Sequence, residues 1–162
     1  MITASELAGF FAAHAIWCVS GGETLIPMLA YATIDGERKI ERLVHERLEQ
    51  AVALGQDKLD ANAMDADDAV LLYDGRIAVE SGKLDAIIVE MRTYFSPRSR
   101  ALFAVPYTPP SSIRFRVHKP KLLQWEHCED FDIGAATEAF FRGVAAHEKG
   151  ARIWNECLDE SK

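Results

Sequence analysis

The chain has 162 residues, of which 49% are apolar and 27% are charged, and its formal net charge is −7. This is enough apolar sequence to bury a core, so we expect one globular domain over residues 1–162. The acidic net charge argues against nucleic acid as a partner, because domains that bind phosphate backbones are usually basic. Three cysteines without disulfide-like or metal-like spacing favour a reducing compartment, and we therefore expect a cytoplasmic protein.

An apolar segment near the start of the chain, residues 7–19 (LAGFFAAHAIWCV), belongs to a helix expected from about residue 3 to residue 18. No Lys or Arg precedes Arg38, so the segment lacks the basic start of a signal peptide, and it is too short to cross a bilayer. We expect a core helix and no membrane contact. Residues 25–34 (LIPMLAYATI) then predict a strand that is buried on both faces.

The next predicted element is an amphipathic helix near residues 41–59. Apolar residues recur at a 3/4 spacing from Ile40 through Val44 and Leu48 to Ala51 and Leu59, which is typical of a helix with one buried face. The sequence leaves open whether residues 37–40 first form a short strand that pairs with the preceding one.

Residues 70–118 carry the pattern of an antiparallel meander. Three strand-like runs (70–73, 76–80 and 84–95) are separated by Asp74-Gly75 and by a Ser-Gly-Lys sequence at 81–83, both typical of hairpin turns. Two further strands are expected at 101–107 and 113–118. In the second of these, period-2 alternation predicts that Phe115 and Val117 point inward and that Arg114, Arg116 and His118 point outward.

A C-terminal helix is expected near residues 133–158, with Asp132 as its N-cap. Gly143 and Gly150 lie seven residues apart on it and would allow another backbone to approach closely. The elements together predict a single α+β domain with an antiparallel meander of about five to six strands, flanked by the N-terminal helix, the helix near 41–59 and the C-terminal helix. The helical spacing predicts a buried stripe formed by Phe140, Val144, His147, Ala151, Trp154 and Leu158.

The charge is segregated along the chain. Residues 91–125 contain seven Lys and Arg and no Asp or Glu, so all 25 acidic residues lie elsewhere. Six aromatic residues share this segment, and Arg with aromatic side chains is typical of interfaces, which predicts a surface that binds an acidic patch on a protein partner or on a second copy. The alternative is that acidic residues elsewhere in the chain neutralise these cations. The expected binding residues are Arg92, Arg100, Arg114, Arg116 and His118.

Residues 85–92 (DAIIVEMR) place a carboxylate shortly before a Glu-x-basic sequence on a strand. This pattern resembles the active strand of the PD-(D/E)xK nuclease family, in which an Asp and the Glu bind a divalent metal and a Lys stabilises developing charge. Here Arg92 replaces the Lys, and alternation points Asp85 and Glu90 to opposite faces. A hydrolase of this kind would therefore use Glu80 with Glu90 and Arg92. The other interpretation is an exposed ion pair between Arg76 and Glu90.

His147 and Trp154 support a third interpretation, a small-ligand pocket between the C-terminal helix and the sheet. His147 is also the residue expected to titrate if that helix packs on a partner. The chain shows no metal-ligand spacing and no phosphate-binding loop, so we expect no metal and no cofactor.

The leading functional prediction is a cytoplasmic protein-interaction domain of adaptor, chaperone-like or immunity-like type. We expect it to be a homodimer and not an enzyme. The alternatives are the metal-dependent hydrolase and the small-ligand-binding domain.

Overall fold

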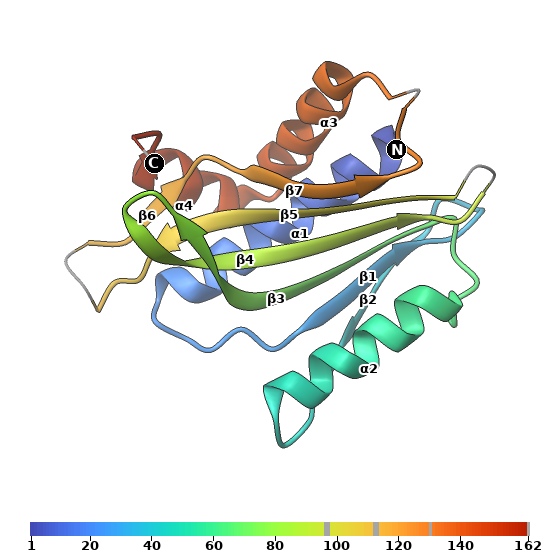
Figure 1. Cartoon of the computed structure of the whole chain (residues 1–162), viewed down its shortest axis with the longest axis horizontal. Coiled ribbons are helices and arrows are strands. Elements are labelled where there is room, and N and C mark those ends of the chain that lie inside the picture. The colour runs from blue at the N-terminus through green and yellow to red at the C-terminus, as the bar shows by residue number, and fades with distance from the viewer. Residues whose placement is uncertain (96–97, 112–113, 130, 162) are drawn as a thin grey trace.

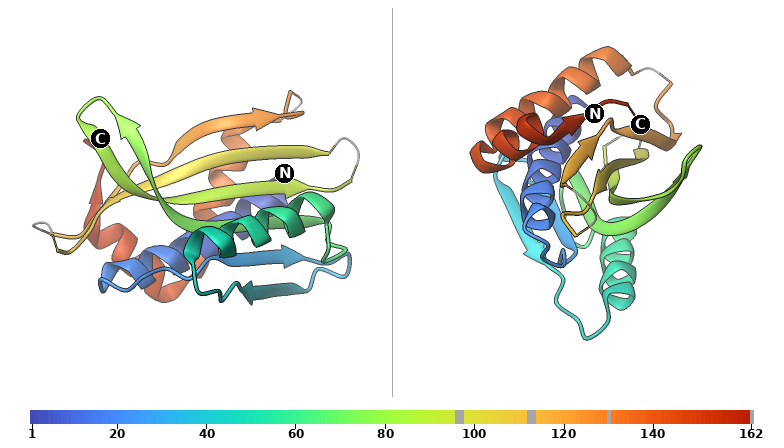
Figure 2. Two further views of the ribbon diagram at one scale, coloured as in Figure 1. Left: turned by 60° about the horizontal axis from the view of Figure 1, so that its bottom comes forward. Right: turned by 90° about the vertical axis from the view of Figure 1, so that its left-hand side faces the viewer.

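One curled sheet carries helices on both of its faces (Figures 1 and 2). The computed structural model describes residues 1–95, 98–111, 114–129 and 131–161, and it is an α+β fold as predicted. The elements in chain order are α1 (Ile2–Ser20), β1 (Met28–Ala32), β2 (Arg38–Arg42), α2 (Leu48–Ala61), β3 (Asp68–Val79), β4 (Gly82–Thr93), β5 (Ser99–Thr108), β6 (Arg116–His118), β7 (Lys121–Glu126), α3 (Ile133–Ala146), α4 (Glu148–Cys157) and β8 (Leu158–Asp159).

The strands of the described chain are ordered β2-β1-β3-β4-β5-β6-β8, and β7 pairs with β5 beside β6. The pairs from β1 to β7 are antiparallel, and β6 with β8 is parallel. The predicted meander is therefore confirmed as β3-β4-β5. Short strands at both margins raise the number of strands above the five to six expected. The strand predicted at 113–118 was expected to begin at Ile113, which lies outside the described residues.

The turn predicted at Asp74-Gly75 is wrong, because β3 runs through these residues without interruption. Asp74 lies opposite Ile87 and Gly75 lies opposite Ala86 in the β3–β4 register. A Cβ on Gly75 would come within 2.9 Å of the Ile88 side chain, so the glycine leaves room for cross-strand packing. The hairpin predicted at residues 81–83 is present in a tighter form, with Val79 opposite Gly82.

The helix predicted near residues 41–59 begins later, at Leu48. Residues 38–42 instead form β2, which pairs antiparallel with β1 and so answers the question that the sequence left open. The start of the predicted apolar stripe is consequently exposed, with Ile40 at 46% and Val44 at 78% relative accessibility. The stripe is buried only from Ala51 to Leu59, where α2 covers the outer face of β1 and β3.

The C-terminal helix predicted near 133–158 is two helices. His147 interrupts it with an extended backbone (φ −92°, ψ 95°), and its ring accepts a hydrogen bond at 2.9 Å from the Gly150 N–H, so that it caps α4. Asp132 is the N-cap of α3 as predicted, and accepts a hydrogen bond from the Ala135 N–H at 3.0 Å. The chain changes direction at this interruption, and both α3 and α4 lie next to α1 (Figure 1).

The main core lies between α1 and the inner face of the sheet. Side chains from α1, such as Leu7 and Ile16, meet Val70, Ile87 and Val89 from the central strands. Helix α1 is long enough and apolar enough to cross a membrane. Buried core helices pass the same test, and 61% of the most apolar window of α1 is buried within this fold.

Helix α3 packs on α1 through glycine at both helix surfaces. A Cβ on Gly143 would lie 2.0 Å from the Glu6 carbonyl oxygen, and one on Gly9 would lie 1.8 Å from the Phe140 carbonyl oxygen. Neither position has room for a methyl group unless the helices separate. The close approach expected at Gly143 is thus confirmed, and the backbone that approaches is that of α1.

We expect Gly143→Ala to lower the free energy of unfolding by about 2 kcal/mol or more, although alanine favours helix, because the methyl group forces the two helices apart. Gly21→Ala is the matched control, since its added Cβ meets nothing within 4 Å and its φ is −87°. It should change stability by less than about 1 kcal/mol. Urea unfolding of the two variants tests this, and equal losses would contradict the packing described.

Candidate functional site: an apolar groove beside strand β7

Three of the seven basic residues in 91–125, namely Arg92, Arg100 and Arg116, have carboxylate partners from outside this segment, and the described residues show no ion pair for the other four. Arg100 pairs with Glu126 at 3.1 Å, and Arg116 pairs with Asp159 at 3.0 Å. Hydrogen bonds from Ser161 and then from Arg116 lower the pKa of Asp159, so this carboxylate is ionised near neutral pH. These acidic partners lie outside residues 91–125, which is why the segment looked unbalanced. Arg114 is exposed and belongs to no ion pair among the described residues.

His118 is buried at 1% accessibility, although it was predicted to point outward into solvent. Its Nδ1 lies 3.2 Å from the Asp159 carbonyl oxygen, which can only accept, so Nδ1 carries a proton. Its Nε2 lies 2.9 Å from the Thr108 hydroxyl. The imidazole therefore joins β5, β6 and β8. His118 lies on the same face as Arg116, as alternation predicts, and its burial could not be predicted from the strand alone because β8 comes from a distant part of the chain.

The candidate catalytic set of Glu80, Glu90 and Arg92 is not brought together. Glu80 is exposed at the β3–β4 hairpin, whereas Glu90 lies far along β4, opposite Leu71. The predicted Arg76–Glu90 pair is also absent, since Arg76 lies opposite Asp85 and pairs with it at 3.5 Å. The β3–β4 hairpin is tighter than expected, so each residue of β3 lies opposite a different residue of β4 than the sequence predicted.

Glu90 instead belongs to a nearly buried network that fixes α2 to the sheet. Its carboxylate accepts hydrogen bonds from Gln56 and from the Tyr73 hydroxyl, each at 2.8 Å. Arg92 lies 3.5 Å from Glu90 and 3.2 Å from Asp60. Burial and the hydrogen bond to Glu90 raise the pKa of Tyr73, so the phenol stays a donor. No cluster of three metal-ligand side chains occurs in the described part of the chain.

We expect Glu90→Ala to destabilise the protein by about 2 kcal/mol or more, because it leaves Tyr73 and Arg92 without their buried acceptor. Glu80→Ala removes the other candidate carboxylate from an exposed turn and should cost less than about 0.5 kcal/mol. Denaturant unfolding of the two variants separates these values. Comparable losses would show that Glu90 has no special role in holding α2.

A pair of histidines that the sequence did not predict joins α1 to the α3–α4 junction. His14 Nδ1 and His147 Nε2 are 3.0 Å apart. Because His147 Nδ1 accepts the Gly150 N–H, the neutral ring has its proton on Nε2 and donates it to His14. Burial lowers the pKa of both histidines, and the charges of Arg42 and Lys149 add to this effect. The folded state therefore favours the neutral form of both rings near neutral pH.

Stability should fall as the pH drops below about 6.5, because the unfolded chain takes up protons there that the folded histidine pair resists. Above that pH both states are neutral at these sites and the effect vanishes. We expect His14→Gln to reduce the loss of unfolding free energy between pH 7.5 and pH 5.5, measured by urea titration. An unchanged loss in the variant would contradict this origin.

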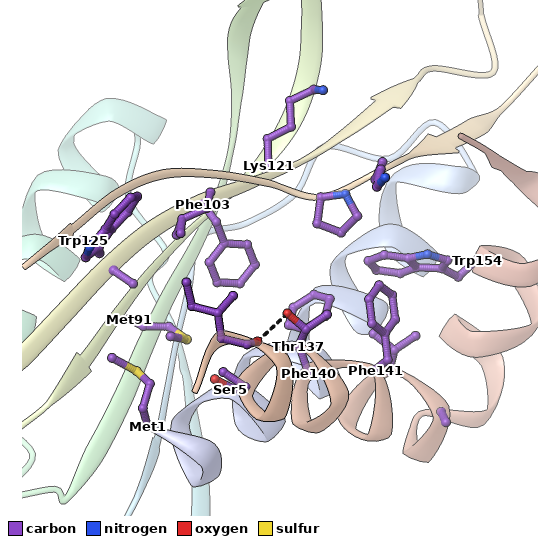
Figure 3. Close-up of a pocket in the computed structure, with 18 of the residues that line it drawn as sticks. Met1, Ser5, Met91, Phe103, Lys121, Trp125, Thr137, Phe140, Phe141 and Trp154 are labelled. Atoms are coloured by element: carbon purple, nitrogen blue, oxygen red, sulfur yellow. Dashed lines mark hydrogen bonds between the residues drawn. The ribbon is translucent and has the colours of Figure 1, made fainter. Parts of the chain in front are cut away.

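An apolar groove of about 660 Å³ lies between the sheet and α3. Figure 3 shows side chains from β4, β5 and β7 on one side and from α3 and α4 on the other, turned toward a common space. Volumes of this order are typical of binding sites. The principal lining side chains are Met91, Phe103, Trp125, Phe140, Phe141 and Trp154.

The aromatic floor of the groove is ordered by edge-to-face contacts. The Phe140 ring lies 5.3 Å from that of Phe103 and 6.1 Å from that of Trp154, and Phe141 stands edge-on to Trp154 at 6.2 Å. These contacts restrict how the rings can turn, so they order the floor of the groove. Trp154 lines it as the sequence predicted, whereas His147 points to α1.

The mouth of the groove is apolar and exposed. Trp125 on β7 is 55% accessible and Ile133 at the start of α3 is 64% accessible. Leu122, Phe141 and Leu158 also expose much of their surface there. A continuous apolar surface of this kind is typical of a binding site rather than of a solvated face. Leu122 and Phe141 were not predicted as site residues, and Trp125 was predicted only as one of the six aromatic residues of the basic segment. The run Leu-Leu-Gln-Trp at 122–125 within a charged neighbourhood was the available signal.

No family model matches the chain, and neither a search of curated proteins nor a search of solved structures finds a match. The groove and its surroundings therefore carry the functional interpretation.

Proposed function

We propose that the protein is an interaction domain that binds an apolar segment of another protein in the groove between α3 and β7. The observation that carries the proposal is the exposed apolar rim formed by Trp125, Ile133 and Phe141 around an ordered aromatic floor. Exposed aromatic side chains beside a desolvated pocket are the usual centre of a protein–protein interface. The basic arginines contribute less than predicted, since acidic neighbours already neutralise several of them.

A small-ligand site, the third interpretation above, is the main competitor. Pockets for small ligands usually surround most of the ligand and carry a few polar groups that orient it. Here the mouth is open, and among the polar groups nearby the Thr137 hydroxyl already donates to the Ile133 carbonyl oxygen and the Cys128 thiol to carbonyl oxygens. These features favour a polypeptide segment. Cytoplasmic location and a homodimeric state belong to the same proposal and stay predictions, the second of which light scattering tests.

The experiment selects peptides from a random twelve-residue phage library on the purified protein and measures their affinity as labelled synthetic peptides. We expect Trp125→Glu and Ile133→Glu each to weaken binding by about tenfold or more, because a charge enters the apolar rim. Ile34→Glu and Val44→Glu are controls, because both are apolar residues at least as exposed as Trp125 and Ile133 but lie outside the groove. They should leave the affinity within about twofold.

Three outcomes would overturn the proposal. The library yields no binders, or the control variants weaken binding as much as the groove variants do. The third is a small molecule that co-purifies with the wild-type protein in native mass spectrometry and is absent from Trp125→Glu, which would identify the groove as a small-ligand site.

A further inference from the structure

The sheet ends at β7 while α3 continues beyond it. On one side β7 pairs with β5, and no strand of the described chain pairs with its other edge. Ile133 and Phe141 of α3 line the groove and are 64% and 42% accessible. Neighbouring strands lie about 4.8 Å apart, so one more strand beside β7 would extend the sheet by that distance past its present edge. Figure 1 shows the divergence of α3 from the sheet.

Two edge strands of the sheet, β2 and β7, differ in chemistry. Edge strand β2 reads Arg-Lys-Ile-Glu-Arg, so four of its five residues are charged, which is the usual protection against unwanted strand pairing. Edge strand β7 reads Lys-Leu-Leu-Gln-Trp-Glu, and its four central residues are uncharged and without proline. β7 is therefore less densely charged than β2, with Lys121 and Glu126 at its two ends and an apolar centre.

A β-bulge aims two side chains of β7 into the groove. Leu122 lies opposite Phe103 and Trp125 lies opposite Ala101, so Leu123 is the extra residue between them. Residues three apart on a regular strand would point to opposite faces, whereas the bulge places Leu122 and Trp125 on the same inner face. The edge therefore presents backbone donors and acceptors beside an apolar inner face.

The outer face of β7 is polar. Lys121 lies opposite Ala104 on the outer side, and Figure 3 shows its chain directed away from the aromatic floor. Lys121 forms no ion pair among the described residues, whereas Glu126 at the other end is held by Arg100. A strand added beside β7 would thus have the apolar groove on its inner face and the unpaired cation of Lys121 near one end of its outer face.

We propose that the partner segment adds to the sheet as a strand along the outer edge of β7, which rests on the proposed function and specifies how the segment is recognised. Its alternate residues are apolar and fill the groove between β7 and α3, while the intervening residues are polar and include an acidic one near Lys121. Main-chain hydrogen bonds to β7 supply affinity, and the groove selects the apolar side chains.

The test uses a peptide selected from the library above and synthesised in two N-methylated forms, each with methyl groups on alternate residues. In a strand, the N–H groups of alternate residues face opposite edges. We expect one form to lose affinity by about tenfold or more and the other to bind within about threefold of the parent, because only one edge pairs with β7. Equal effects, whether both forms bind or neither does, would overturn strand addition.

Two further measurements separate this proposal from the function on which it rests. Hydrogen exchange should slow at the amides of residues 121–126 when the unmethylated peptide binds, and Lys121→Glu should weaken a peptide that carries the acidic residue more than one in which it is replaced by Gln. Binding without protection of β7 would reject strand addition and leave the groove as the site. Failure of every selected peptide would reject the proposed function itself.

Discussion

The contact between α1 and α3 determines how this molecule presents a surface. With glycine at positions 9 and 143, the two helix backbones touch, and α3 takes its place from α1 rather than from the sheet. The sheet meanwhile is anchored on α1 by the central strands. The groove lies between the sheet and α3 and is lined by side chains of β4, β5 and β7 on one side and of α3 and α4 on the other. A helix held by larger side chains would sit farther from α1 and leave a differently shaped space.

Several ion pairs in this fold join different secondary-structure elements. The arginines of β4, β5 and β6 each find a carboxylate contributed by another element: Asp60 of α2, Glu126 of β7 and Asp159 of β8. Each pair reduces the positive field around its own arginine, whereas Arg98, Arg114, Lys119 and Lys121 have no ion pair among the described residues. Beside β7, apolar surface and an unpaired strand edge coincide with one of these cations, Lys121.

His147 connects the two halves of this arrangement. The chain leaves α3 at His147, whose ring accepts a hydrogen bond from the first turn of α4 and contacts His14 on α1. Because the ring accepts through one nitrogen and donates through the other, this arrangement uses the neutral imidazole. Helix α4 carries Trp154 into the floor of the groove and leads into β8, which closes over His118. The position of Trp154 in the groove floor therefore depends on the contact between His14 and His147, which lies outside the groove.

Local patterns in the sequence determined the class of each element, since strand alternation, helical spacing and the Asp132 cap act between residues close in the chain. They predicted the β3-β4-β5 meander, the close approach at Gly143 and the burial of Trp154. Tertiary structure decided the rest. Asp74-Gly75 became part of a long strand because a complete hydrogen-bonding ladder outweighs a turn preference, and residues 38–42 became a strand because β1 had a free edge. The partners of Glu90, Arg116 and His118, and the groove between β7 and α3, come from segments far apart in the chain. Such contacts are set by how helices and sheet pack, which no short stretch of sequence encodes.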